Sequence, residues 1–439
     1  MMEARVVVLL SAMLASLGAI HGSQHSRPEV KVMVMQKGLS YANNILVSKI
    51  VQEIEGLRIP SVKPRSSLTL YHSAVTSAVI KSTALLADGS MNALTLILDL
   101  QRIQIQGSYM SDFWFGTSVG YYDLNLNKVR ITKHLAIGKD ELGRPTVSSK
   151  SCQTVIEDSK MTFSKGTSAW TDFILTTLVA IARKTIQTKI ENLMCQSITA
   201  AIIEKGEDIP KAYSAARPVD NCSAIEFPLL DNPTIKHGQI DFFLQGNVSS
   251  TCRPLIYSRS RGASRVFRVD PLSPDKMLHV VIGDDLVNTL LELRYWSKKL
   301  DIGFIGGMGV SIKLTTPPVY TTTPDGATIR APAVVSDNNI SVSMAFTASV
   351  IISENNGSLV FEIIQISLVR TQLIKAGADG VTNKMLLDVI TRSETEIVER
   401  LNRIFSNTLP LPLIRGMILQ NNEISYDQGV TILSSDFLV

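Results

Sequence analysis

The chain has 439 residues, of which 45% are apolar and 19% charged, an unusually apolar balance for a soluble protein. Its formal charge of +4 is too small to indicate nucleic-acid binding and permits only mild attraction to anionic lipid surfaces. Beyond the N-terminus, no stretch approaches the roughly twenty apolar residues that a membrane-spanning helix needs. The apolar excess is therefore distributed along the chain, and it favours a lined interior cavity over a core alone.

The N-terminus has the pattern of a secretory signal. Arg5 is followed by an apolar run from Val6 to Ile20, and small residues follow near Ala19 to Ser23. Because the run is too short for a membrane anchor, we predict a cleaved signal peptide over residues 1–22. The mature protein is then secreted and extracellular.

The first half of the chain changes from a helical to a strand pattern. Apolar residues recur at helical spacing over 37–57, which predicts an amphipathic helix. From about 66 to 160 the period is two, as in the alternating Leu94 to Leu100, and this predicts strands. The alternation slips by one residue before Ile103, which indicates a β-bulge.

A long helix is expected over about 166–204. Its apolar residues lie on more than one face, so something besides its own sheet must cover it. Strand patterns at 223–229 and 239–249 complete the first half. The stretch 253–268, with Pro254 and several Arg and Ser, is the best candidate for a linker.

The second half repeats this order in a more diverged form. It predicts a helix, a run of strands, a second helix and two closing strands, over 284–300, 302–372, 382–407, 414–419 and 429–438. Two similar modules that bury apolar surface are typical of a binding protein. We therefore predict an N-terminal domain over 28–250 and a C-terminal domain over 271–439, joined by a linker over 251–270.

Four cysteines, Cys152, Cys195, Cys222 and Cys252, allow three pairings in an oxidising compartment. Pairing of sequence neighbours closes the shorter loops, so we favour Cys152 with Cys195 and Cys222 with Cys252. A zinc site is the competing interpretation, but no CxxC pair and no nearby His supports it. Secretion also makes four Asn-X-Ser sequons candidate glycan sites, at Asn221, Asn247, Asn339 and Asn356.

No group of residues typical of catalysis stands out. The six histidines are scattered, and the chain has no HExxH or paired-carboxylate motif. We therefore expect no enzyme, no cofactor and no metal site. An extracellular hydrolase is kept as a disfavoured third class, because the members of a triad need not be adjacent in sequence.

Three stretches carry a distinctive pattern. Residues Val32–Ala42 read VMVMQKGLSYA, the Cys152 to Cys195 segment contains Trp170 and the long helix, and Leu409–Pro412 reads LPLP. In these stretches the chain resembles the family of bactericidal/permeability-increasing, lipopolysaccharide-binding and phospholipid-transfer proteins. The order of elements matches over nearly the whole mature chain, although the middle of the second half is matched by pattern only.

The resemblance implies an α+β fold with a boomerang shape. Two tubular lipid-binding domains, each a strongly curved antiparallel sheet wrapped on a long helix, are joined by a central sheet. An apolar slot between helices and sheet holds acyl chains in each domain, and a Cys152–Cys195 bridge would pin the long helix to the sheet. Burial of acyl chains contributes roughly 0.8 kcal/mol per CH2, so such a slot binds lipid without catalytic residues.

We assign both slots to apolar residues of the expected helices, with ordinary core packing as the alternative role of each. The first slot is assigned to Leu46, Ile50, Ile54, Phe173, Leu178 and Ile181. The second slot is assigned to Leu286, Leu290, Leu387, Ile390 and Leu401.

The far end of the N-terminal domain distinguishes members of this family. Where the bactericidal member has a Lys-rich loop, this chain has Ser108–Gly116 without a basic residue, which is more similar to the aromatic tip of the phospholipid-transfer member. Aromatic rings on a loop suit the membrane interface. The membrane tip is assigned to Tyr109, Phe113, Trp114 and Phe115. The alternative is that these rings plug the end of the barrel.

The leading hypothesis is a secreted protein that binds and transfers phospholipids or other acyl lipids and docks on membranes or lipoprotein-like particles. The alternative is an innate-immune protein that binds bacterial lipopolysaccharide. Four basic residues would give that alternative a modest, salt-sensitive attraction to anionic membranes, namely Arg58, Lys63, Arg65 and Lys165. An ordinary solvated surface is the simpler interpretation of these four.

Overall fold

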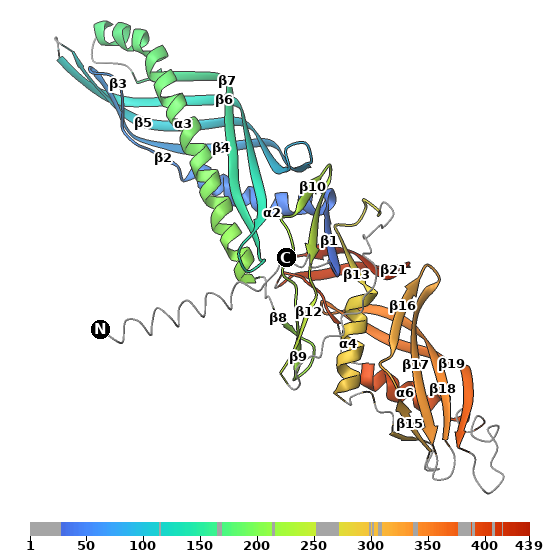
Figure 1. Cartoon of the computed structure of the whole chain (residues 1–439). Coiled ribbons are helices and arrows are strands. Elements are labelled where there is room, and N and C mark those ends of the chain that lie inside the picture. Colours follow the sequence, from blue (N-terminus) through green and yellow to red (C-terminus); the bar gives the residue numbers. More distant parts are fainter. Residues whose placement is uncertain are drawn as a thin grey trace, which may run out of the picture.

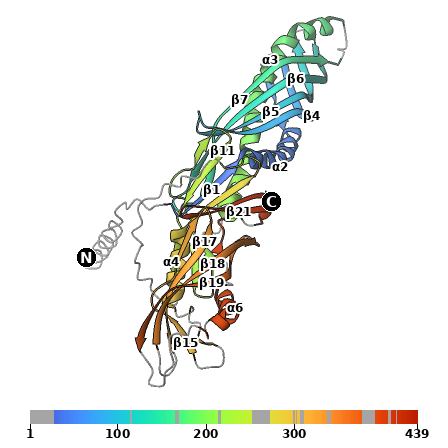
Figure 2. The ribbon, with the colours of Figure 1, turned by 90° about the vertical axis from the view of Figure 1, so that its right-hand side faces the viewer.

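The computed structural model describes residues 28–113, 116–164, 169–212, 216–251, 272–297, 300, 303–305, 310–336, 341–375, 388, 391–405, 409–414 and 416–439. The molecule is elongated, with a lobe at each end of a central sheet (Figures 1 and 2). We call residues 36–212 the N-terminal lobe and residues 284–410 the C-terminal lobe. The predicted signal peptide and most of the predicted linker lie outside the described residues.

The central sheet has six strands in the order β10-β11-β1-β13-β22-β21. Their bounds are β1 Val30–Met35, β10 Thr234–Lys236, β11 Gln239–Leu244, β13 Leu278–Gly283, β21 Ile418–Asp427 and β22 Val430–Leu438. All pairs are antiparallel, and β1 lies beside β13 with Val32 opposite Val280. Each half of the chain supplies three neighbouring strands, so this sheet joins the two lobes, as the resemblance implied.

Each of the two middle strands runs directly into a helix. Helix α2 (Gln36–Glu55) begins at the residue after β1, and α4 (Asp284–Trp296) begins at the residue after β13. The buried carboxylate of Asp284 accepts hydrogen bonds from the backbone N–H and the hydroxyl of Thr322, at 2.9 and 2.7 Å. A carboxylate in the first turn also suits the positive end of the helix dipole. The repeated order of elements is therefore visible in the structure.

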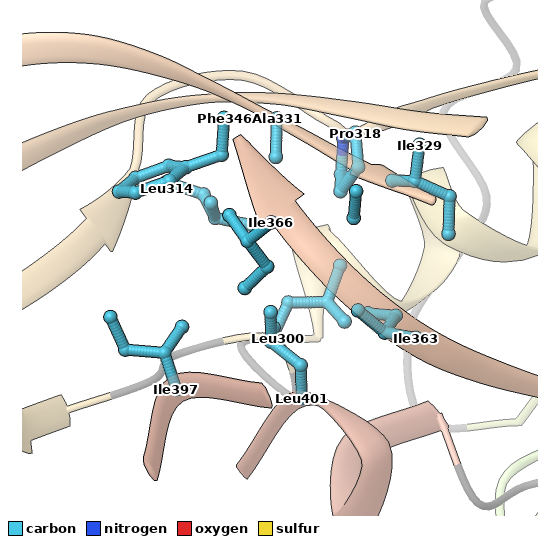
Figure 3. Close-up of a pocket in the computed structure, with 11 residues that line it drawn as sticks. Leu300, Leu314, Pro318, Ile329, Ala331, Phe346, Ile363, Ile366, Ile397 and Leu401 are labelled. Atoms are coloured by element: carbon cyan, nitrogen blue, oxygen red, sulfur yellow. The ribbon is translucent and has the colours of Figure 1, made fainter. Parts of the chain in front are cut away.

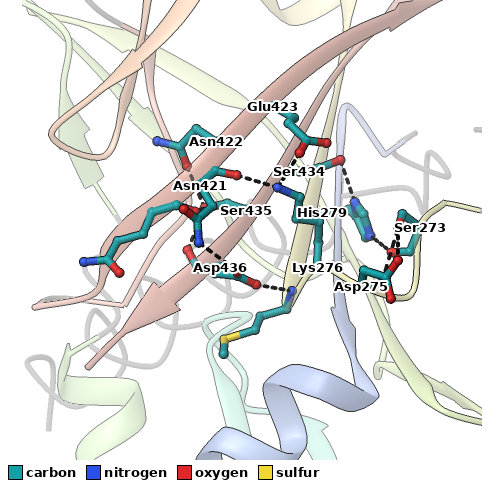
Figure 4. Close-up of polar contacts among 12 residues, drawn as sticks. Ser273, Asp275, Lys276, His279, Asn421, Asn422, Glu423, Ser434, Ser435 and Asp436 are labelled. Atoms are coloured by element: carbon teal, nitrogen blue, oxygen red, sulfur yellow. Dashed lines mark hydrogen bonds and ion pairs between the residues drawn. The ribbon is translucent and has the colours of Figure 1, made fainter.

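A polar network involves the neighbouring strands β13 and β22 of the central sheet (Figure 4). The ring of His279 is fully buried; one ring nitrogen lies 2.8 Å from the Ser434 hydroxyl and the other 2.9 Å from the Ser273 carbonyl oxygen. The carbonyl can only accept, so Nε2 carries the proton and Nδ1 accepts from Ser434. Burial lowers the pKa of His279, which keeps the ring neutral in the folded protein.

The N-terminal lobe is a curled sheet in the order β2-β4-β5-β6-β7, with β3 also paired to β4. Its strands are β2 Arg58–Ile59, β3 Val62–Arg65, β4 Leu68–Asp88, β5 Ala93–Phe113, β6 Gly116–Lys139 and β7 Pro145–Phe163. The 44-residue helix α3 (Ala169–Ala212) runs along it, as Figure 1 shows. Helix α2 packs on β4, α3 packs on β7, and the two helices touch each other.

The core of this lobe follows the alternation in the sequence. Leu94, Leu96, Leu98 and Leu100 are each at most 7% exposed, because a period of two places them all on the inner face. The predicted bulge is confirmed at Gln101, since Leu100 and Arg102 pair with the adjacent residues Ile80 and Val79 of β4.

The C-terminal lobe has shorter elements. Its sheet has the order β14-β15-β17-β18-β19-β20, with β16 paired to β17. The strands are β14 Gly303–Ile305, β15 Val310–Leu314, β16 Val319–Thr323, β17 Gly326–Ser336, β18 Ser341–Asn355, β19 Ser358–Lys375 and β20 Leu409–Pro410. Helix α6 (Glu394–Phe405) packs on β19, and the first residues of the helix predicted from 382 lie outside the described residues.

A small fourth sheet follows the long helix. It has the order β12-β9-β8, from β8 Ala216–Pro218, β9 Ser223–Glu226 and β12 Asn247–Ser250. The fold is thus α+β, built from antiparallel sheets, with a curled sheet covered by helices in the N-terminal lobe.

Candidate functional site

A pocket opens between helix and sheet in the C-terminal lobe (Figure 3). Its lining residues come from β15, β17, β18, β19, α6 and two connections, and they are Leu300, Leu314, Pro318, Ile329, Ala331, Phe346, Ala348, Ile363, Ile366, Ile397 and Leu401. Every one of these side chains is apolar. The cavity volume is about 30 Å³, and the empty space is about 490 Å³ when the open mouth of the pocket is included. The pocket is therefore a narrow apolar slot.

The residues assigned to the second slot divide into three groups. Leu401 lines the pocket, as Figure 3 shows. Leu286 and Leu290 of α4 are buried in the core of the same half without lining the pocket. Leu387 and Ile390 lie outside the described residues. Sequence reasoning missed the strand residues of the lining, because inward strand positions of a pocket and of a solid core have the same alternating pattern.

The residues assigned to the first slot lie on the helices that cover the N-terminal sheet. Ile50, Ile54 and Leu178 are buried in the core of this lobe, at 1%, 1% and 5% exposure, and Leu46 packs against it while half-buried. Ile181 is half-buried. The side chain of Phe173 lies outside the described part of the chain. The apolar faces of α2 and α3 therefore do face the interior, and which of these side chains touch a lipid stays a prediction.

A disulfide fastens the long helix to the edge of the sheet. Cys152 of β7 and Cys195 of α3 are bonded, with their Cα atoms 5.9 Å apart, which confirms the favoured pairing of these two residues. Cys222 is also disulfide-bonded. Its predicted partner, Cys252, lies outside the described residues.

One part of the predicted membrane tip is wrong. Tyr109 is fully buried: its ring packs edge-on against Phe163, with centroids 4.9 Å apart, and its hydroxyl donates to the carbonyl oxygen of Ser164 at 3.3 Å. The opposite residue on β6 is Gly120, where a Cβ would come within 2.7 Å of the Tyr109 ring. Tyr109 therefore plugs the end of the barrel. Trp114, Phe115 and the side chain of Phe113 lie outside the described residues.

An exposed apolar patch lies on the outer face beside this plug. Met110 of β5 is 41% exposed, and its partner Val119 and the nearby Tyr121 of β6 are 63% and 73% exposed. We call these three residues the outer patch. It flanks the hairpin in which Phe113 pairs with Gly116. The sequence signal for the patch is the set of apolar residues at the outward positions of β5 and β6.

A buried lysine also escaped the sequence analysis. Lys133 of β6 is 2% exposed and shares the inner face of the sheet with Ile131 and Leu135. Its ammonium donates to the hydroxyls of Ser149 and Thr199, at 2.5 and 2.6 Å. The available signal was its position, since it interrupts an otherwise apolar inward row.

Comparison with known proteins shows a resemblance to one family. A family model described as "LBP / BPI / CETP family, N-terminal domain" matches residues 32–205. A crystal structure of lipopolysaccharide binding protein superposes over 94% of this chain and 99% of its own, with a TM-score of 0.63 and 17% identity. Residues 32–205 are therefore similar to the N-terminal domain of the LBP/BPI/CETP family. The structural likeness by itself shows the shared fold.

Curated members of the LBP/BPI/CETP family are similar at low identity. A bactericidal permeability-increasing protein of Sebastes schlegelii is 25% identical over 54% of this chain and 51% of its own length. A mouse lipopolysaccharide-binding protein is 23% identical over 78% and 75%. A mouse phospholipid transfer protein is 21% identical over 68% and 59%. The match thus spans about half the length of the first of these relatives.

The described residues were also compared with two other kinds of site, a metal centre and a membrane-spanning helix. They contain no group of three or more His, Cys, Asp or Glu residues placed to hold a metal ion. No helix in this part of the chain is both long and apolar enough to cross a membrane. The relatives reported above are a bactericidal permeability-increasing protein, a lipopolysaccharide-binding protein and a phospholipid transfer protein.

Proposed function

We propose that this protein is secreted, shelters the hydrocarbon chains of a lipid inside its lobes and transfers phospholipid between membranes or lipoprotein-like particles. The observation that carries the proposal is the slot of the C-terminal lobe, whose lining is entirely apolar. Burial of about ten methylene groups, once the slot has widened, would stabilise the complex by roughly 8 kcal/mol. Binding of this kind needs no catalytic group.

One side of the slot is formed by a short helix. Helix α6 has only 12 residues and contributes Ile397 and Leu401 to the lining. Leu401 is half-buried, so part of its surface already faces the mouth. Rotation of these side chains would widen the narrow slot while Asn402 keeps α6 on β19 through its hydrogen bonds with the backbone of Ile363.

Docking on a membrane is assigned to the end of the N-terminal lobe. The outer patch of Met110, Val119 and Tyr121 continues toward the hairpin that carries Trp114 and Phe115. Apolar and aromatic side chains of this kind partition into the membrane interface. Tyr109 takes no part in this contact, because it supports the hairpin from inside.

Secretion is supported by two observations. The N-terminal sequence has the pattern of a signal peptide. The Cys152–Cys195 bridge is of a type that persists in oxidising compartments. Of the sequons, Asn356 lies in the exposed turn between β18 and β19 with φ at 50°, which is a suitable place for a glycan. Mass spectrometry of the protein from culture medium would test both the cleavage near residue 22 and this modification.

The second candidate function is capture of bacterial lipopolysaccharide. Arg58, Lys63 and Arg65 are exposed on β2 and β3, and Arg65 pairs with Leu68, itself opposite Ser111 near the same end of the lobe. These charges give a modest, salt-screened attraction to an anionic surface. Lys165 lies outside the described residues.

One pair of assays separates the two functions. Movement of fluorescent phosphatidylcholine between vesicles and binding of lipopolysaccharide are each measured at two salt concentrations. Phospholipid transfer predicts transfer that survives high salt and falls several-fold in Val119→Asp and in Trp114→Ala. The matched control is Val155→Asp, which places the same charge on an exposed residue in the middle of β7.

The outcomes of these assays are distinct. Salt-sensitive lipopolysaccharide binding that is unchanged in both tip variants would favour the second function. Absence of transfer and of lipid in native mass spectra of the purified protein would overturn the first. Turnover of an ester substrate by the pure protein would favour the hydrolase class instead.

A further inference from the structure

Among the described residues of the N-terminal lobe, Lys133 is the buried charged side chain. Lys133 lies between Ile131 and Leu135 on the inner face of β6, opposite Leu96 of β5 and Cys152 of β7. Its side chain is 2% exposed, whereas a lysine on a strand ordinarily points to solvent. The methylene groups of Lys133 therefore lie within the apolar wall. Whether Lys133 binds a ligand or only supports the fold depends on where its ammonium group lies.

The ammonium contacts neutral oxygens. It donates to Ser149 Oγ and to Thr199 Oγ1, and the Thr199 hydroxyl in turn donates to the Cys195 carbonyl oxygen at 2.6 Å. An ammonium has three N–H donors, so one remains for another acceptor. Among the described residues no carboxylate lies within 4.0 Å of Lys133 Nζ. Burial lowers the pKa of Lys133 and no charged neighbour opposes that effect.

The charge lies at a seam between strand and helix. Ser149 of the edge strand β7 is exposed, and Thr199 of α3 is half-exposed, so the Lys133 ammonium is located just beneath the surface. Thr199 is one helical turn beyond Cys195, whose bridge to Cys152 fixes the width of this seam. Directly inside are fully buried apolar side chains, including Leu96, Met194 and Ile198. A cation at the edge of this apolar interior is complementary to a lipid that has one hydrocarbon chain with an acid group at its end.

We propose that Lys133 binds the acid group of a single-chain anionic lipid at the β7–α3 seam, while the hydrocarbon chain of that lipid lies along the apolar inner face. The shared chemistry is an oxyanion on an acyl chain, either the carboxylate of a fatty acid or the phosphate of a lysophospholipid. This inference rests on the proposed function and adds a ligand class to the N-terminal lobe. Ser149 and Thr199 are positioning residues, because they hold the ammonium at the seam.

The test compares a charged probe with its neutral ester. Binding of the naturally fluorescent cis-parinaric acid and of its methyl ester is titrated with the full chain. We expect the wild-type protein to bind the acid about tenfold more tightly, since hydrogen bonds to a charged group contribute roughly 1.5 kcal/mol or more. Lys133→Met should remove this preference and leave the affinity for the ester unchanged. Competition by lysophosphatidic acid against oleate then identifies which acid group is preferred.

The control is Lys150→Met, which removes the same charge from an exposed lysine next to Ser149. It should keep the preference for the acid. Lys133→Met should melt no lower than the wild type, because methionine replaces a buried unpaired charge with an apolar chain of similar length. Its melting curve therefore separates loss of the site from loss of the fold.

Three results would overturn the proposal. Equal binding of the acid and the ester by the wild type would show that Lys133 does not bind the acid group, and it would leave the proposed function unaffected. An equal loss of acid binding in Lys133→Met and Lys150→Met assigns the effect to overall charge. Absence of binding of either probe counts against both this inference and the proposed function.

Discussion

The two lobes share an order of elements but differ in how they are held. The four long strands of the N-terminal sheet have 19 to 24 residues, and the lobe has a 44-residue helix and a disulfide between helix and sheet. The C-terminal lobe has strands of at most 18 residues, helices of 13 and 12 residues and an apolar slot. The N-terminal lobe thus fixes its long helix to its sheet covalently, whereas α6 of the C-terminal lobe is held on β19 by packing and by the hydrogen bonds of Asn402 with Ile363.

The lobes also differ in the polarity of their interiors. The N-terminal interior has Lys133 at its seam, whereas the lining of the C-terminal slot has no polar side chain. An uncharged binding site selects its ligand by length and shape, whereas a binding site with a cation also selects its ligand by charge. The two lobes are therefore expected to prefer different lipids.

The largest effect is expected from removal of the disulfide that holds the N-terminal lobe. Replacing both Cys152 and Cys195 with Ser opens a loop with a sequence separation of 43, which lowers the free energy of unfolding by about 4 kcal/mol in the chain-entropy model. Hydrogen exchange read by mass spectrometry should show faster exchange in α3 and β7. The C-terminal lobe is the internal control, and uniform acceleration in both lobes would contradict the contrast.

The next largest effect is expected when the slot of the C-terminal lobe is filled by a larger side chain. Ala331→Phe places a ring in the C-terminal slot, and overpacking should lower the free energy of unfolding by about 1–3 kcal/mol. Lipid bound per chain in native mass spectra should fall by about one molecule, while the acid preference assigned to Lys133 persists. Ala136→Phe, on the outer face of β6, is the matched control. Unchanged lipid content in Ala331→Phe would remove the slot from the binding site.

A pH-dependent effect is expected at the junction of the lobes. The folded protein holds His279 neutral with a lowered pKa, because the ring is buried between Ser434 and Ser273. The unfolded chain binds a proton more readily, so stability is complete above about pH 6.5 and declines as the pH falls below it. Denaturation midpoints at pH 7.5 and 5.5 should show a smaller difference in His279→Gln. A drop confined to one lobe would contradict a role at the junction.

The smallest effect concerns the surface of the long sheet. Lys128 and Glu157 form an ion pair of 3.3 Å on the outer face of the N-terminal lobe, with both side chains more than half exposed. Lys128→Ala is expected to change the free energy of unfolding by less than about 0.5 kcal/mol. A larger change in chemical denaturation would mean that surface charges, and not only the disulfide and core, hold this lobe.

The long strands could be predicted because their signal is local. Leu94 to Leu100 alternate, and the slip before Ile103 marks the bulge that the structure places at Gln101. The central sheet could not be derived in this way, since pairing of β1 with β13 joins residues about 250 positions apart. It was expected only from the resemblance to known proteins.

The errors at the site have physical causes as well. Tyr109 was assigned to the membrane because its neighbours are aromatic, yet the parity of β5 and the absence of a side chain at Gly120 turn its ring inward. Lys133 was not singled out because a single lysine in a strand usually marks the solvent face. The slot lining combines residues from four strands and one helix, and no local pattern distinguishes such a lining from solid core.

The direct passage from β1 into α2 and from β13 into α4 has a mechanical consequence. With no intervening loop to absorb rotation, any change in the twist of the shared sheet is transmitted to both helices at once. Lys37 in the first turn of α2 adds a second linkage, through its ion pair of 2.8 Å with Asp436 of β22. A change of twist at either end of the central sheet is therefore expected to affect the helices of both lobes.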